Sequence, residues 1–242
     1  MNKPRVVAIH QPNFFPWLGF FDKIFRADVF VILDDVQMPH TGGTWCNRVR
    51  VRIDNDARWL TMPIVRAPGL RKISEVAINE STRWRDKVCG TLHACYGKAP
   101  FFKNLFPQCE PLVRCAEASL LLYNVQSIKG MLKLLGHPGN SLRLASEFDM
   151  ASTGTQRLID LVKACGGSTY LTGGGADGYQ EDALFAEQGV SLLYQNFRHP
   201  VYDQGGREFL IGLSVLDALF WAGPEYIHEQ LSAGSACRES SV

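Results

Sequence analysis

The sequence predicts an α/β protein whose N-terminal part contains a parallel sheet. Arg5–Ile9 is a short β-branched run of the kind that forms a buried strand. Trp17–Arg26 places apolar residues at helical spacing after Pro16, and Val29–Leu33 is a second buried run. A strand, a helix and a strand in this order form a βαβ unit, whose strands are normally parallel with a right-handed crossover.

The remaining elements follow from the same patterns. Two alternating runs, residues 45–53 and 58–64, flank the turn signal Asp54-Asn55-Asp56 and predict a hairpin. Ser81 or Thr82 is the expected N-cap of the next helix. Helices are expected over residues 81–96, 117–135, 156–165, 183–188 and 213–221, and short strands over residues 168–171 and 190–194.

The pattern of elements suggests a division of the chain near residue 140. Residues 1–140 form the α/β N-terminal part, and residues 141–231 form a smaller part that is helical or α/β. Residues 232–242 are polar and are expected to be a disordered tail.

Composition and charge exclude several classes of protein. The chain has 242 residues, of which 46% are hydrophobic, so it can bury a core and is not intrinsically disordered. Its 25 basic and 24 acidic residues give a net charge of +1, which argues against bulk nucleic-acid binding. No apolar run reaches the 18 residues of a membrane span, and no secretory signal precedes residue 10, so we expect a cytoplasmic protein.

The cysteines predict reduced thiols rather than a metal site. Their number, seven, is odd, and no CxxC spacing occurs. Most are expected to be buried as small apolar side chains. If one is a nucleophile, Cys46 and Cys165 are the best placed.

The first polar motif follows the first predicted strand. His10, Gln11 and Asn13 leave the strand as hydrogen-bonding side chains, and Trp17 can form a wall of a pocket. Ligands of open α/β sheets bind at the carboxyl ends of the strands. We therefore expect these residues to bind substrate, with His10 as a general acid or base; the alternative is a capping loop.

Two further motifs lie in the N-terminal part. Asp34 and Asp35 follow the second strand, with Gln37 beside them. An acid at this position can orient a substrate amine or hydroxyl, bind Mg²⁺ or cap the next element. Since successive strand residues point to opposite faces, one of the two acids is expected to face the pocket. Asn47 and Arg48 are candidates for binding a carboxylate or phosphate; the alternative is a solvated strand face.

Two motifs in the C-terminal part complete the predicted site. Tyr170 precedes a glycine-rich turn with Gly173 and Gly174, which can hold an anion or be a simple tight turn. After the last predicted strand come further candidates for substrate binding and one for acid–base catalysis: Gln195, His199, Tyr202 and Gln204. Ser214 and Asp217, three residues apart, instead indicate helix capping.

These motifs together resemble the WbqC-like proteins. The residues that carry the resemblance are IHQPNFFPWLGFFDKI, LDDVQ, WCNRVRV, WLTMPI, YLTGGGADGY, YQNFRHPVYDQ and LSVLDALF, spread from about residue 6 to about residue 225. The resemblance implies a bacterial enzyme of surface-polysaccharide or natural-product biosynthesis that transfers an acyl or aminoacyl group, such as glycine, to an amine or hydroxyl. The substrate is then a small molecule, and the donor is a thioester, an adenylate or an aminoacyl-tRNA.

The run from Gln11 to Gln37 is also similar to the opening of pantothenate synthetase and related nucleotidyltransferases. The histidines of their HxGH motif are absent, and Phe15-Pro16-Trp17-Leu18-Gly19 stands in that place. This likeness leaves a second hypothesis, an ATP-dependent ligase that activates a carboxylate with ATP and Mg²⁺. A third hypothesis is a non-catalytic binding or scaffold protein of a biosynthetic complex. No cofactor other than ATP with Mg²⁺, and no resident metal, is implied.

Overall fold

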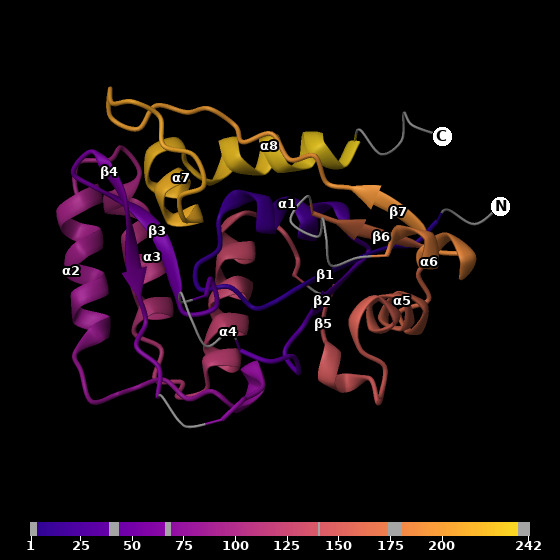
Figure 1. The fold of residues 1–242 in the computed structure, drawn as a ribbon. Helices are drawn as coiled ribbons and strands as arrows, with labels where there is room; N and C mark the ends of the chain where they lie inside the picture. Colours follow the sequence, from indigo (N-terminus) through magenta and orange to yellow (C-terminus); the bar gives the residue numbers. More distant parts are fainter. Residues whose placement is uncertain (1–3, 39–43, 66–68, 140, 174–180, 237–242) are drawn as a thin grey trace.

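A five-stranded parallel sheet forms the centre of the molecule (Figure 1). The computed structural model describes residues 4–38, 44–65, 69–139, 141–173 and 181–236. The strands lie in the order β5-β2-β1-β6-β7, and every neighbouring pair is parallel. Their bounds are β1 Val6–His10, β2 Val29–Ile32, β5 Leu142–Leu144, β6 Thr169–Thr172 and β7 Ser191–Tyr194.

The first strand along the chain is therefore central, and the chain builds outward from it on both sides. This is the order of a doubly wound sheet, in which the direction of winding reverses between β1 and β6. The crevice outside the carboxyl ends of these two strands is where such sheets bind ligands. The predicted N-terminal and C-terminal parts both contribute strands to this one sheet.

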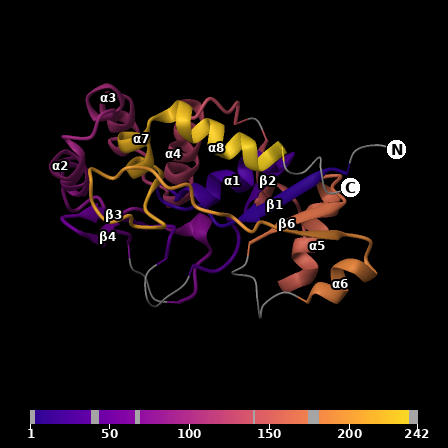
Figure 2. The ribbon, with the colours of Figure 1, turned by 90° about the horizontal axis from the view of Figure 1, so that it is seen from above.

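Each face of the sheet packs against its own helices (Figure 2). Val7, Ile9, Val29 and Val31 pack in a core with α5 (Gly154–Ala164) and α6 (Asp182–Glu187). The alternate residues, among them Val6, Ala8, Phe30 and Ile32, belong to the larger core of α1 (Leu18–Arg26), α7 (Val215–Ala222) and α8 (Pro224–Ala236). Strands buried on both faces explain why these runs are continuously apolar.

A helical layer with a hairpin extends the larger core away from the sheet. The strands β3 (Arg48–Ile53) and β4 (Asp56–Thr61) pair antiparallel. Beside them lie α2 (Trp84–Tyr96), α3 (Phe102–Val113) and α4 (Leu120–Leu134), and two short 3₁₀ helices cover Ile73–Glu75 and Ala145–Glu147. None of the helices in the described part of the chain is long and apolar enough to cross a membrane.

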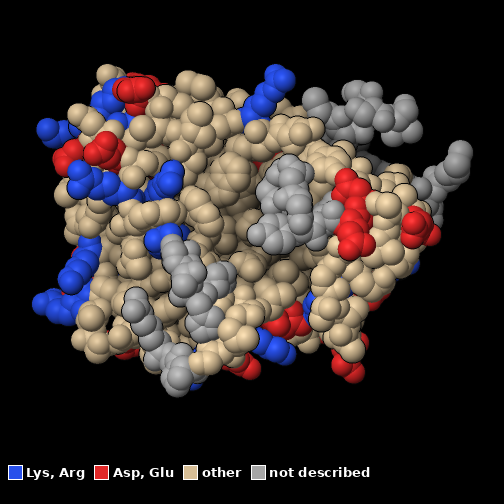
Figure 3. Space-filling model, viewed as in Figure 1, with Lys and Arg blue, Asp and Glu red and all other residues tan. Residues whose placement is uncertain are grey.

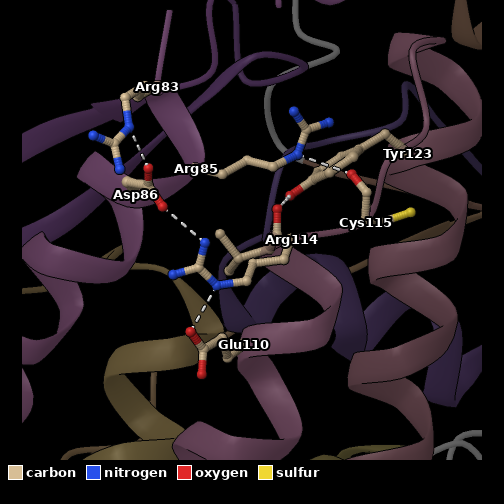
Figure 4. Close-up of polar contacts among 8 residues, drawn as sticks. Arg83, Arg85, Asp86, Glu110, Arg114, Cys115 and Tyr123 are labelled. Carbon is tan, nitrogen blue, oxygen red and sulfur yellow. Dashed lines mark hydrogen bonds and ion pairs between the residues drawn. The ribbon is translucent and has the colours of Figure 1, made fainter.

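A charged cluster joins α2 to α3 on the surface (Figure 4). The carboxylate of Asp86 accepts hydrogen bonds from Arg83 and Arg114, both at 2.8 Å, and Arg114 also reaches Glu110 at 2.7 Å. These donors hold the pKa of Asp86 below its usual value, Arg114 most strongly. Because the pairs are exposed to solvent, we expect them to add little to the free energy of unfolding.

The predicted fold class, a parallel α/β sheet, is confirmed, while the nucleotidyltransferase-like part of the prediction is not. The sequence does not predict helices α3 and α8, strand β5 or the two 3₁₀ helices. Helix α3 contains Pro107 and Pro111, which normally end helices, yet its apolar face, with Phe102, Phe106 and Cys109, is buried. Tertiary burial here outweighs the local preference of proline.

The region after Gly223 contains a helix that the sequence does not predict. Gly223 adopts φ 83° and ends α7, but Pro224 then begins α8 as its first residue, a position that proline favours. Helix α8 runs to Ala236, so the start of the predicted tail is helical; residues 237–242 lie outside the described residues. The predicted cap of α2 is also wrong, since Arg83 occupies the N-cap position, whereas Ser214 caps α7 through its hydroxyl as expected.

Candidate functional site

The carboxyl ends of β1 and β6 bring two of the predicted motifs together. Ala8 pairs with Leu171, and the same register continued by two residues brings His10 level with Gly173. Figure 3 shows that this face of the molecule is hollowed between the region of the β3–β4 hairpin and that of β6 and β7. The polar residues at the reversal point of the sheet therefore lie where the fold class binds its ligands.

His10 is held in one orientation by the backbone that follows it. Its Nδ1 lies 2.9 Å from the carbonyl oxygen of Gln11, and its ring contacts Phe20 edge-on at 5.1 Å. Since a carbonyl only accepts, Nδ1 carries the proton and Nε2 keeps its lone pair. Burial, and to a lesser degree the charge of Lys23, lowers the pKa of His10 to about 4. The imidazole is therefore neutral at physiological pH.

Lys23, on α1, is the unpredicted member of this group. Only 6% of its surface is exposed, and a Cβ added to Gly173 would lie 3.2 Å from its Nζ, so the glycine allows the ammonium to approach the end of β6. Burial lowers the pKa of Lys23 to about 8, and the charge of Asp22 opposes that shift. Among the described residues, Nζ has no hydrogen-bond or ion-pair partner.

The neighbouring carboxylate is already engaged. Asp22 accepts a hydrogen bond from the Gln195 amide at 2.8 Å and pairs with Arg26 at 3.4 Å. The Gln195 amide also donates to the carbonyl of Gly19 at 2.6 Å, and Arg26 donates to the carbonyl of Gln195 at 2.6 Å. The predicted binding residue Gln195 thus fastens β7 to α1 and forms a hydrogen bond with the carboxylate of Asp22.

Asp34 and Asp35, beyond the end of β2, point to different partners. Asp34 is 1% exposed, and its Oδ1 accepts a hydrogen bond from the backbone N–H of Ser146 at 3.0 Å. Asp35 forms an ion pair with Arg157, which is also largely buried. No group of three or more His, Cys, Asp or Glu side chains that could hold a metal ion occurs within the ranges that the structure describes.

The hairpin holds the predicted pair Asn47 and Arg48. The Asn47 amide donates to the carbonyl of Met62 at 3.0 Å, inside the core. The Arg48 guanidinium lies 4.0 Å from the ring centre of Trp59, a partly exposed tryptophan that also contacts Trp45. Gln37, beyond β2, is exposed.

The residues of the loop after β7 lie in two environments. The ring of His199 packs between Phe197 and Phe209, and its Nδ1 lies 3.0 Å from the carbonyl of Pro200. Burial lowers the pKa of this ring. Trp17, from the first motif, contacts Phe197 at 5.4 Å, so an aromatic chain connects the loop to α1.

Tyr202 and Gln204 belong instead to a buried network around Arg52. The Arg52 guanidinium donates to Gln204 Oε1 at 2.6 Å and to the carbonyl of Glu208. Asp217, fully buried on α7, accepts from Tyr202 at 2.8 Å and from the Gln204 amide at 3.0 Å. These contacts fasten the loop to the hairpin and to α7.

The remaining candidates lie in the core or outside the described residues. Asn13 is buried in the loop after β1, Tyr170 stacks on Phe185 in the smaller core, and Gly174 lies outside the described residues. Gln11 Oε1 lies 3.8 Å from Cys46 Sγ. Burial raises the pKa of Cys46 to about 11 and also raises that of Cys165, so both remain thiols at neutral pH.

The structure thus brings together His10, Gly173 and Gln195, and adds Lys23 to them, whereas the Gln11 side chain lies beside Cys46. Sequence reasoning missed Lys23 because it treated the helix only as an apolar element. The signal was present: Asp22-Lys23 interrupts the apolar run Leu18–Phe25, and α1 buries both charged residues. A charged pair inside an otherwise apolar helix indicates either a paired structural ion or a site.

Fold and site define a doubly wound α/β protein with a neutral histidine and a buried lysine at the reversal point of its sheet. The chain belongs to the WbqC-like protein family, whose match covers residues 11–229. It is 31% identical over 228 residues to the uncharacterized protein Rv1507c of Mycobacterium tuberculosis (strain ATCC 25618 / H37Rv), covering 91% of this chain and 95% of that protein. No solved structure matches the chain.

Proposed function

We propose that this protein transfers an acyl or aminoacyl group to an amine or hydroxyl of a small molecule, in polysaccharide or natural-product biosynthesis. The observation that carries the proposal is the imidazole of His10 at the carboxyl end of β1. Its Nδ1–H is bound by the Gln11 carbonyl, and its Nε2 is left as a proton acceptor. The low pKa of His10 keeps the ring in the unprotonated form that a general base requires.

In the proposed reaction, the nitrogen or oxygen of the acceptor attacks the carbonyl carbon of the donor. As the new bond forms, the proton of the acceptor passes to His10 Nε2. The protonated ring then returns that proton to the leaving group when the bond between the acyl carbon and the donor breaks. We place His199 second as an acid–base candidate, because aromatic rings surround it. Asp34 or Asp35 would orient the acceptor.

A transfer assay tests this proposal directly. The protein is incubated with three classes of glycyl donor (a thioester, an adenylate and a charged tRNA) and a mixture of amino-sugar and amine acceptors. Mass spectrometry then detects acceptors whose mass has increased by the acyl group. We expect transfer by the wild type and a loss of at least about 100-fold in His10→Gln, since general bases contribute about 10²–10⁴-fold.

The matched control is His93→Gln, because His93 is exposed on α2. It should retain full activity. Equal transfer by His10→Gln and the wild type, or no transfer from any of the three donors, would contradict the proposal.

A second candidate, an ATP-dependent ligase that activates a carboxylate, is favoured by the strand order. Doubly wound sheets commonly bind nucleotides at the point where the winding reverses. A nucleotide that binds only the folded protein raises its melting temperature by mass action. Millimolar ATP with Mg²⁺ should therefore raise the Tm; an unchanged Tm would argue against this candidate.

A further inference from the structure

We infer that Lys23 binds a permanently anionic group, a carboxylate or a phosphate, of a ligand that enters between the ends of β1 and β6. The inference deepens the proposed function, because it gives the substrate a required acidic group at that site. It rests on the position of one buried ammonium group and on the absence of an acceptor for it among the described residues.

The ammonium lies where a ligand of this fold would be. Helix α1 carries Lys23 back over the sheet, and its Nζ lies close to Gly173, the residue that follows β6. A Cβ at Gly173 would lie 3.2 Å from Nζ, so the lack of a side chain at this position lets the ammonium approach the end of β6. His10, at the end of β1, is near enough for the charge of Lys23 to lower its pKa.

No residue in the described part of the chain forms an ion pair with Lys23 Nζ. A buried ammonium is costly unless it is paired and hydrogen-bonded. The Asp22 carboxylate, whose charge opposes the lowering of the Lys23 pKa, is bound by Gln195 and Arg26, and no ion pair joins it to Lys23. The other described groups near this position are neutral: His10, Gly173 and the Gln195 amide, whose Oε1 lies 3.7 Å from the Cβ position of Gly173. An anionic ligand would satisfy the ammonium that these residues leave unsatisfied.

The protonation state favours anion binding over reaction as a free amine. With a pKa of about 8, Lys23 is mainly an ammonium at pH 7. His10 stays neutral over this range and adds no competing charge change. Anion binding should therefore weaken as the pH rises above 8.

Calorimetric titration with two probes, inorganic phosphate and acetate, tests the inference on the full chain. At pH 7 we expect at least one probe to bind the wild type, and its affinity to fall at least tenfold in Lys23→Met and at least tenfold at pH 9.5. Binding of phosphate alone indicates a phosphate-bearing ligand, and binding of acetate alone indicates a carboxylate. Lys87→Met, which changes an exposed lysine on α2, is the control and should bind as the wild type does.

A measurement without a variant protects the test against a folding defect. Acetylation of Lys23 by an N-hydroxysuccinimide ester, followed by peptide mass spectrometry, should slow at least fivefold when the bound probe is present, while acetylation of Lys87 should not. Equal affinity of Lys23→Met and the wild type would overturn the inference. So would the absence of binding of either probe at a concentration 50 times a dissociation constant of about 1 mM. His10→Gln should abolish transfer and keep anion binding, so the proposed function and this inference can fail separately.

Discussion

Two buried cations, Arg52 and Lys23, differ in whether the described part of the chain supplies hydrogen-bond acceptors for them. Arg52 has acceptors from the loop that covers it, Gln204 Oε1 and the Glu208 carbonyl, and the carboxylate of Asp217 lies in the same network. Lys23 is buried to a similar degree, at 6% exposed against 3%, but no acceptor binds it in the described part of the chain. The first cation holds elements together, and we propose that the second binds an anionic ligand.

The difference shows that burial of a charge does not by itself distinguish structure from function. What distinguishes them is whether the protein completes the hydrogen bonds of the group. A cation with its own acceptors should stabilise the fold, whereas a cation without them should destabilise it. The two methionine substitutions below should therefore have opposite signs.

The largest effect is expected at Arg52. Arg52→Met leaves Gln204, the Glu208 carbonyl and Asp217 buried without their cation, and breaking a buried charged network typically costs about 3–5 kcal/mol. Urea denaturation should show this loss as a lower midpoint with an unchanged slope. Arg50→Met is the matched control on the same strand, and because Arg50 is exposed it should cost about 0.5 kcal/mol or less. Equal losses in the two variants would contradict a structural role of the network.

The next largest effect, of opposite sign, is expected at Lys23. In the folded protein its pKa falls from 10.5 to about 8, so at pH 7 the buried ammonium destabilises the fold by up to about 3 kcal/mol. Lys23→Met should remove that cost and raise the free energy of unfolding at pH 7, and the gain should shrink as the pH rises from 8 toward 10.5. A destabilised Lys23→Met protein at pH 7 would mean that Lys23 has a structural partner. The measurement is urea denaturation at pH 7 and pH 10.

These two residues also show what the sequence could and could not reveal. The apolar runs beside His10 and Asp34 identified the central strands, because strands buried on both faces are continuously apolar. The network around Arg52 could not be predicted from the sequence, because Arg52 and Gln204 are 152 positions apart in the chain. The sequence predicts Tyr202 and Gln204 as substrate-binding residues, but it could not show that Tyr202 contacts Asp217 or that Gln204 contacts Arg52. Lys23 was visible as a charge in an apolar helix, but only the sheet order shows that it lies at the reversal point.

A smaller effect concerns the pH dependence of the network around Arg52. Burial raises the pKa of Asp217 from 3.8 to about 6, against the hydrogen bonds from Tyr202 and Gln204 and the charge of Arg52. The folded state binds the proton of Asp217 more tightly than the unfolded state does, so this proton contributes to the free energy of unfolding below pH 4. The contribution, about 2–3 kcal/mol in total, is lost as the pH rises through 6. Asp217→Asn does not titrate, so its stability relative to the wild type should increase between pH 4 and pH 7. A constant difference over that range would show that Asp217 has the same pKa folded and unfolded.

The smallest effect on stability, and the one that most sharply separates the two regions, is expected at Gly173. Its φ does not lie in the left-handed region, and the new Cβ of Gly173→Ala would lie 3.2 Å from the flexible end of Lys23 and 3.7 Å from Gln195 Oε1, an ordinary van der Waals distance. We therefore expect a change of less than about 1 kcal/mol in the free energy of unfolding. Binding of phosphate or acetate should nevertheless weaken severalfold, because the methyl group occupies space in front of the ammonium. Urea denaturation and calorimetry on the same preparation measure both quantities, and unchanged anion affinity in a folded Gly173→Ala protein would place the ligand elsewhere.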